Sequence, residues 1–252
     1  MTKELEFRVI EEAVGGVALH SAVLIYRGAN STAFATVHPI HHDDAGAASI
    51  LPGRPMTMLA VARLAKRLGS ARRPGGFVPM NLLYQDLTTM AWWVPPARRH
   101  IWFRCTGGEL GAPERGESVP HPGLVFAATS DRTWRVWAVK GCDRPSEATP
   151  LFQAPYFNVY GTGAICQGNV DVPTGGFAES VADRIEAWNK AFFDSFFTHP
   201  NTQGPLVNYK GGPYRFWRDM LDGRHAVFPE SALVPLGTSL AQVLDRRGPD
   251  GG

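Results

Sequence analysis

The sequence predicts an α+β fold, and three observations lead to this prediction. Short apolar runs rich in Val, Phe and Trp alternate with turn residues between positions 77 and 140, as expected for strands. Two segments, 56–69 and 178–197, repeat their apolar residues at helical spacing instead. The links between the strands are too short for helical crossovers, so we expect an antiparallel β-meander.

Length and composition narrow the class of protein. A chain of 252 residues corresponds to one or two domains, and 44% hydrophobic with 19% charged residues is typical of a globular protein. A net charge of +2 gives no reason to expect a nucleic-acid partner. No apolar run approaches the roughly 20 residues that span a bilayer. The charged N-terminus and three cysteines predict a cytoplasmic protein with reduced thiols.

The N-terminal part is expected to be rich in strands, followed by a polar loop over 41–49 and a boundary near residue 52. Alternating or β-prone residues predict strands at 5–10, 17–20, 22–26 and 33–37. The expected domains are a β-rich extension over 1–52, a main domain over 53–246 and a disordered tail over 247–252.

The main domain is expected to begin with the helix at 56–69. One face of this helix is apolar, and the opposite face carries the three basic residues Arg63, Lys66 and Arg67 together with Leu59. Further along, the segments 124–128 and 134–139 predict a hairpin. The second long helix follows at 178–197, with shorter helical pieces near 216–221 and 238–245.

One loop contains the strongest chemical candidate. Cys166 follows Asn158 by eight residues, and Gly161, Gly163 and Gly168 lie between or beside them. Glycines allow sharp turns and close approach of a ligand to the backbone. A lone cysteine is often only a small buried residue. No histidine is near in sequence, which disfavours a Cys–His protease.

The spacing of Asn158, Gly163 and Cys166, with Ile165 before the cysteine, resembles that of ubiquitin-conjugating enzymes. The chain departs from their pattern in having Tyr156-Phe157 for His-Pro and Gln167-Gly168 for Leu-Asp, and in the extension before the first helix. With these departures it is more similar to the prokaryotic ubiquitin-conjugating-like family D, a group that includes protein B of the PRTRC plasmid-associated system. Phe157-Asn158, the segment 163–168 and Pro173 support this resemblance.

The resemblance implies a ubiquitin-conjugating-like core, made of an N-terminal helix, a four-stranded antiparallel meander, an active-site loop and C-terminal helices. It also implies that Cys166 accepts a ubiquitin-like protein as a thioester and passes it to an amine. The donor would be a ThiF-type activating enzyme, and a metal-dependent deconjugating peptidase would share the operon, in a plasmid or antiphage defence system. No cofactor, nucleic acid or membrane is expected to take part.

The same resemblance suggests roles for individual residues. Asn158 would stabilise the oxyanion or hold the loop that does so, with Tyr156, Gly163 and Gln167 as supporting residues of the loop. Tyr156 could equally be a packing aromatic. Leu59, Arg63, Lys66 and Arg67 would dock the activating enzyme, although a solvated helix face explains the basic residues as well.

Two alternatives belong to other classes of protein. The first is a non-catalytic module that binds a ubiquitin-like protein. The second is a metal-dependent hydrolase that uses His38, His41 and Asp43, although an ordinary polar surface loop also accounts for these residues. His199-Pro200-Asn201 repeats the family triplet, but no cysteine follows it, so it is interpreted as a helix end and loop start. Cys105 and Cys142 are interpreted as structural thiols.

Overall fold

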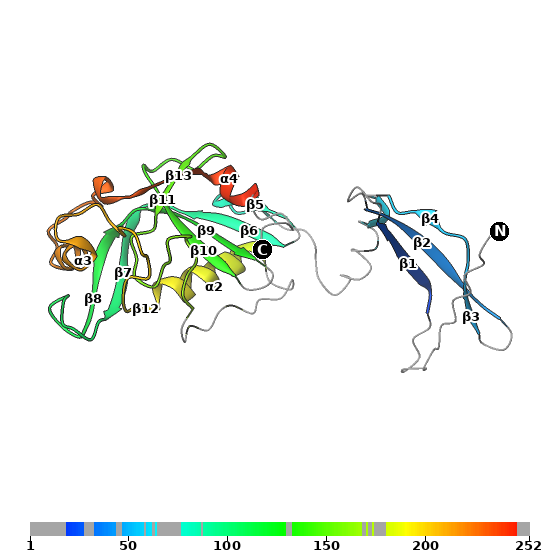
Figure 1. The fold of residues 1–252 in the computed structure, drawn as a ribbon, viewed down its shortest axis with the longest axis horizontal. Coiled ribbons are helices and arrows are strands. Elements are labelled where there is room, and N and C mark those ends of the chain that lie inside the picture. Colours follow the sequence, from blue (N-terminus) through cyan, green and yellow to red (C-terminus); the bar gives the residue numbers. More distant parts are fainter. Residues whose placement is uncertain are drawn as a thin grey trace. The chain divides into compact units, whose positions relative to one another are not determined.

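A computed structural model shows two compact units, Met1–Pro74 and Gly75–Gly252. Each unit is described by itself (Figure 1). The domain boundary near residue 52, after which the main domain is expected to begin, stays a prediction. The structure describes residues 19–27, 33–43, 47–57, 59–61, 64, 77–86, 88–129, 133–167, 170, 173 and 180–245.

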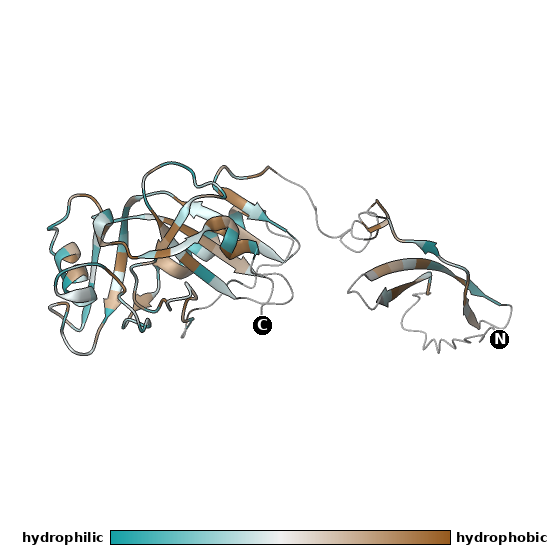
Figure 2. Cartoon of the chain, turned by 45° about the horizontal axis from the view of Figure 1, so that its top comes forward, coloured by the Kyte–Doolittle hydropathy of each residue, from teal (hydrophilic) through white to brown (hydrophobic). Residues whose placement is uncertain are grey.

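The first unit contains a small antiparallel sheet. β1 (Ser21–Arg27) pairs with β2 (Ala33–His42), and β2 also pairs with β3 (Ala48–Ile50) and β4 (Arg54–Pro55). The strands predicted at 22–26 and 33–37 are therefore confirmed. The expected loop at 41–49 lies partly within β2 and β3. Figure 2 shows hydrophobic residues along these strands.

Two other expectations for the first unit fall largely outside the described residues. The strand predicted at 5–10 lies wholly outside them. In the helix predicted at 56–69, Leu59, Ala60, Val61 and Leu64 are helical, and the Val61 amide donates to the Thr57 carbonyl at 2.9 Å.

The second unit is built on a six-stranded antiparallel sheet with the order β13-β11-β10-β9-β6-β5. Its two central strands, β9 and β10, form the predicted hairpin, with Trp134 opposite Ala128. Their apolar runs are continuous because both faces of the sheet are covered. Leu124 and Phe126 belong to the large core, and Val125 to a smaller cluster that includes Leu240. The strands are β5 (Leu82–Gln85), β6 (Thr89–Val94), β9 (Gly123–Thr129), β10 (Trp134–Val139), β11 (Pro150–Gln153) and β13 (Pro235–Ser239).

A second sheet has the order β12-β7-β8. β7 (Ala97–Arg104) pairs antiparallel with β8 (Glu114–His121) and parallel with the two-residue β12 (Phe196–Phe197). Alternate residues of β7 point inward, so Ile101 and Phe103 are fully buried while their neighbours in the strand are exposed or half-buried. This pairing brings residue 196 next to residue 102, which positions the candidate site described below.

Helix α2 (Val181–Phe193) covers one face of the large sheet (Figure 1). Ser180 and Asp183 form a capping box that fixes its start. Its buried stripe packs on the sheet through Trp188 against Trp134, with ring centroids 4.8 Å apart, and Phe192 against Phe126, at 5.0 Å. The predicted helix at 178–197 is shorter in the structure because residues 196–197 pair with β7.

The C-terminal part contains short helices. α3 (Gly212–Leu221) and α4 (Leu240–Asp245) confirm the helical pieces expected near 216–221 and 238–245. A 3-10 turn, η1 (Glu230–Ala232), lies between them.

The predicted fold class is wrong. The structure is rich in strands arranged in several sheets, and a ubiquitin-conjugating-like core with its helices is not what it shows. The segment expected to be a single meander divides between two sheets, because β7 leaves its neighbours and pairs with β8 and β12. The Gly- and Pro-rich segments 107–123 and 151–175 are predicted from the sequence to be loops, but β8 forms within the first and β11 reaches into the second. β11 and β13 together extend the large sheet.

Candidate active site

Residues 158–166 form a short hairpin. The Tyr160 amide donates to the Ala164 carbonyl at 2.8 Å, and the Cys166 amide donates to the Asn158 carbonyl at 2.7 Å. Between these two bonds, Val159 and Ile165 form an antiparallel bridge. This pattern places Asn158 directly opposite Cys166.

The hairpin continues the large sheet. β11 pairs with β10 only at Trp137 and Ala138. Alongside the first half of β10, the hairpin pairs with β10 in place of β11. The Val136 amide donates to the Gly163 carbonyl at 2.8 Å, and the Ile165 amide donates to the Trp134 carbonyl at 3.2 Å. The candidate loop is therefore held by a rigid strand of the core.

Gly163 closes the turn of the hairpin, and the position requires a glycine. Its φ is +81°, in the region that residues with a side chain rarely adopt. A Cβ atom at this position would lie 2.6 Å from Nε1 of Trp137 and 3.0 Å from the Val136 carbonyl oxygen. The hairpin can approach β10 this closely only because the side chain is absent.

Asn158 joins the hairpin to the segment that follows α2. Its Nδ2 donates to the Phe196 carbonyl at 2.9 Å. Its Oδ1 accepts from the Thr198 amide at 3.1 Å and from the Thr198 hydroxyl at 2.7 Å. Its backbone, at a φ of +60°, donates to the His199 carbonyl at 2.9 Å. These bonds hold the loop by its asparagine.

The sequence predicts a helix end and the start of a loop at His199-Pro200-Asn201. The structure instead brings its first residue to the candidate loop, since the His199 carbonyl binds the Asn158 amide. The His199 ring also lies 2.9 Å from the Thr198 hydroxyl, which in turn donates to Asn158. Sequence reasoning missed this contact because it joins residues about 40 positions apart and leaves no local pattern.

Tyr156 is fully buried and both packs and forms a hydrogen bond. Its ring contacts Phe192 and Trp217. Its hydroxyl lies 2.6 Å from Nδ1 of His121, whose Nε2 lies 3.2 Å from the Arg99 carbonyl. A carbonyl only accepts, so Nε2 carries the proton and the Tyr156 hydroxyl donates to Nδ1.

The charge state of His121 follows from its surroundings. Burial, reinforced by the nearby charge of Arg99, lowers the pKa of His121 to about 3, so the ring is neutral. Burial likewise raises the pKa of Tyr156. His121 is thus a supporting residue of the loop that the sequence did not indicate, because it lies on another strand, 35 positions away.

The three cysteines occupy different environments. Cys166 is half-buried at the end of the hairpin, and interaction with its side chain raises the pKa of Tyr160. Cys105 is buried and donates to the Thr198 carbonyl at 3.1 Å, and burial raises its pKa to about 11. Cys142 is exposed. Gln167, after Cys166, is half-buried, and its carbonyl accepts from the Val170 amide at 2.8 Å.

The structure tests little of the expected docking face for the activating enzyme or of the alternative metal site. Leu59 is 60% exposed, whereas Arg63, Lys66 and Arg67 lie outside the described residues. His38 bonds to the Thr36 hydroxyl and the Leu51 carbonyl. Within the described part of the chain, no group of three or more His, Cys, Asp or Glu side chains could hold a metal ion.

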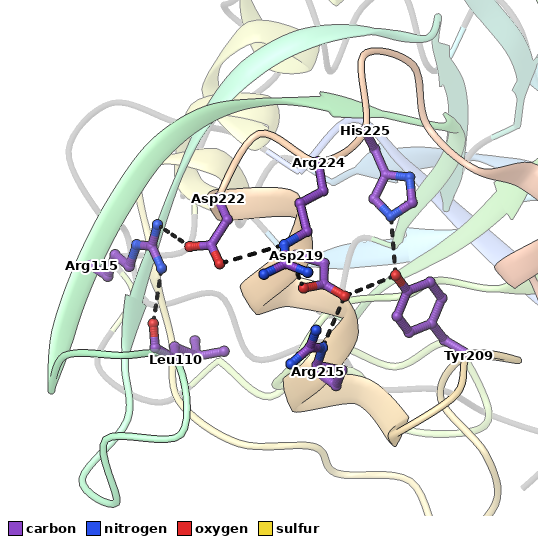
Figure 3. Close-up of polar contacts among 8 residues, drawn as sticks. All are labelled: Leu110, Arg115, Tyr209, Arg215, Asp219, Asp222, Arg224 and His225. Carbon is purple, nitrogen blue, oxygen red and sulfur yellow. Dashed lines mark hydrogen bonds and ion pairs between the residues drawn. The ribbon is translucent and has the colours of Figure 1, made fainter.

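A separate polar cluster surrounds the buried Asp219 of α3 (Figure 3). Asp219 accepts from the Tyr209 hydroxyl and from Arg215, each at 3.0 Å, and pairs with Arg224 at 3.2 Å. Burial opposes its ionisation, but these bonds and charges hold the pKa of Asp219 below its usual value. The cluster connects α3 to the loops on either side of it, so we interpret it as structural.

The geometry defines a class of protein: one that presents a thiol on a sheet-anchored hairpin, opposite an asparagine. Comparison with protein families identifies which one. The model of prokaryotic E2 family D matches residues 58–236, more than half of the chain and the whole hairpin, and the chain belongs to this family. It therefore has a role related to ubiquitin-like conjugation. No curated protein and no solved structure matches it. None of the helices in the described part of the chain is long and apolar enough to cross a membrane.

Proposed function

We propose that this protein is a conjugating enzyme that carries a ubiquitin-like protein as a thioester on Cys166. A ThiF-type activating enzyme supplies the activated C-terminal carboxyl group. The Cys166 thiolate attacks that carbonyl carbon and forms a C–S bond, while the bond from the carbonyl carbon to its activating group breaks and that group departs with the electron pair. An amine then attacks the thioester, a C–N bond forms, and the sulfur departs as thiolate while the amine proton goes to solvent. Thiolates suit this cycle because they are good nucleophiles and good leaving groups.

The observation that supports this proposal is the hairpin itself. It lies within the region that matches the family and places Cys166 opposite Asn158 on a fixed strand of the core. Cys105 is buried with a raised pKa, which makes it a poor nucleophile, and Cys142 lies outside the hairpin.

For Asn158 we propose the role of holding the loop. Its carboxamide already makes three hydrogen bonds to residues 196–198. These bonds tie the hairpin to β12 and to the start of the following loop. We therefore assign Asn158 to positioning Cys166 rather than to direct contact with the oxyanion.

A second candidate function is a non-catalytic module that binds a ubiquitin-like protein in a plasmid or defence system. The occupied carboxamide of Asn158 favours it, because that side chain is less available for chemistry than an oxyanion donor would need to be.

A thioester trap separates the two functions. The protein is incubated with ATP, a ubiquitin-like protein and a ThiF-type activating enzyme, then analysed on a non-reducing gel. The enzyme predicts a thiol-sensitive adduct in the wild type and in the matched control Cys142→Ser, and its loss or replacement by a thiol-resistant ester in Cys166→Ser. Charging of the activating enzyme without any adduct on this protein would favour the binding module.

A further inference from the structure

The pairing of the hairpin determines which side chains share a face. Residues directly opposite each other in an antiparallel pair point to the same side, and alternate residues point to opposite sides. Val159 is fully buried and its partner Ile165 packs against the core, so these two face inward. Asn158, Tyr160, Ala164 and Cys166 therefore share the outward face.

Tyr160 and Cys166 are diagonal neighbours on this face. Tyr160 is opposite Ala164, and Cys166 is two residues further along the same strand. Diagonal neighbours lie within reach of an aromatic side chain. The Tyr160 side chain therefore lies within reach of the Cys166 sulfur on this shared face, and the residue remains 43% exposed.

We propose that Tyr160 is a further catalytic residue, whose hydroxyl donates a hydrogen bond to the Cys166 sulfur and stabilises the negative charge on that atom. The proposal rests on the proposed function. Charge is present on the sulfur before the thioester forms and returns when the C–S bond breaks. At both points the phenol O–H donates without transferring its proton.

Two observations support this assignment. Interaction with the Cys166 side chain raises the pKa of Tyr160, so the phenol keeps the proton that it would donate to the sulfur. The other polar side chain on the face, Asn158, is engaged with Phe196 and Thr198. Tyr160 is thus the side chain on this face whose polar group is placed to reach the sulfur.

The first test measures thiol reactivity in the protein alone. Wild type and Tyr160→Phe are alkylated with iodoacetamide at pH 7, and the rate at Cys166 is divided by that at the exposed Cys142 in the same sample, using mass spectrometry of the peptides. A hydrogen bond to a charged group shifts an ionisation equilibrium by roughly tenfold. The greater intrinsic reactivity of the freed thiolate offsets part of that. We expect the ratio to fall about threefold in the variant, and the difference to disappear or reverse at pH 9.5.

The matched control is Tyr84→Phe, which removes another half-exposed tyrosine hydroxyl, one that is bonded to Asp86. This control should leave the ratio at Cys166 unchanged. A ratio that is the same in Tyr160→Phe and wild type at both pH values would overturn the hydrogen bond to the sulfur.

The second test measures discharge of the thioester to a free amine. If wild type and Tyr160→Phe are both charged and the variant discharges about three- to tenfold more slowly, the catalytic role is supported. Equal discharge rates would overturn the role of Tyr160 and leave the proposed function intact. A wild type that is never charged, beside a charged activating enzyme, would overturn the proposed function and with it any catalytic role, while alkylation still reports on the hydrogen bond.

Discussion

Asn158 and Cys166 lie directly opposite each other in one hairpin, joined by a hydrogen bond of 2.7 Å from the Cys166 amide to the Asn158 carbonyl. The eight-residue spacing in the sequence therefore corresponds to a hairpin that brings the two residues together. Because the same hairpin is bonded to β10, the position of the thiol depends on the core of the second unit.

Gly163→Ala should unfold or displace this hairpin. The substitution combines a positive φ with a collision against Trp137, so we expect a loss of roughly 2–4 kcal/mol in the free energy of unfolding, measured with urea, and loss of thioester formation. The matched control is Gly141→Ala, where φ is +77° but no atom lies within 4 Å of the added Cβ. Equal effects at the two positions would show that the contact with Trp137 is unimportant.

Thr198→Val tests the bonds that hold Asn158. The variant keeps the shape and the backbone amide but removes the hydroxyl that donates to Oδ1 at 2.7 Å. We expect a loss of about 1 kcal/mol in stability and a slower charging of Cys166, read on the gel. Thr202→Val, in the same loop, is the control and should change charging little. Normal charging of Thr198→Val would argue against a positioning role for Asn158.

The two central strands of the large sheet, β9 and β10, and the candidate loop could be predicted from the sequence. The continuous apolar runs at 124–128 and 134–139 identified the central hairpin, and the spacing of Asn158, Gly163 and Cys166 identified the loop. These signals are local, since each depends on residues within about ten positions of one another.

The remaining features depend on contacts between distant residues. β8 resembled a loop because of residues such as Gly116, but a Cβ at that position would collide with the Trp102 ring that packs over it. A glycine can therefore belong to a strand that a large neighbour covers. The parallel pairing of β12 with β7, and the contacts of Asn158 with Thr198 and of Tyr156 with His121, likewise cross long intervals of sequence.

Stability should decrease in acid because of His121. Its pKa is about 3 in the fold and about 6.5 in an unfolded chain, so between these values the unfolded state binds the extra proton. Above pH 6.5 the ring is neutral in both states, and protonation of His121 does not reduce the free energy of unfolding. As the pH falls below 6.5 the free energy of unfolding decreases, by on the order of 3 kcal/mol at pH 4. Urea denaturation of His121→Gln across this range should show a flatter dependence on pH than wild type. Parallel curves for His121→Gln and wild type would contradict a buried neutral ring.

Asp219→Asn should destabilise the second unit. The variant leaves Arg215 and Arg224 without their shared carboxylate, and we expect a loss of about 2 kcal/mol in the free energy of unfolding measured with denaturant, since the carboxylate is buried but both arginines are half-exposed. Because the pKa of Asp219 is lowered in the fold, this contribution is present at neutral pH and disappears as the carboxylate is protonated in acid. The control Glu114→Gln breaks an exposed pair with Arg104 and should cost less than about 1 kcal/mol. Similar losses in the two variants would contradict the importance of burial here.

The most direct test of the account is the position of the adduct. The protein is charged with a ubiquitin-like protein by a ThiF-type activating enzyme and ATP, and the adduct is digested and sequenced by mass spectrometry. We predict that the C-terminal residue of the modifier is joined to the sulfur of Cys166, and to the oxygen of the serine in Cys166→Ser. An adduct on Cys142 or on a lysine, with Cys166 unmodified, would contradict the assignment of Cys166 as the carrier.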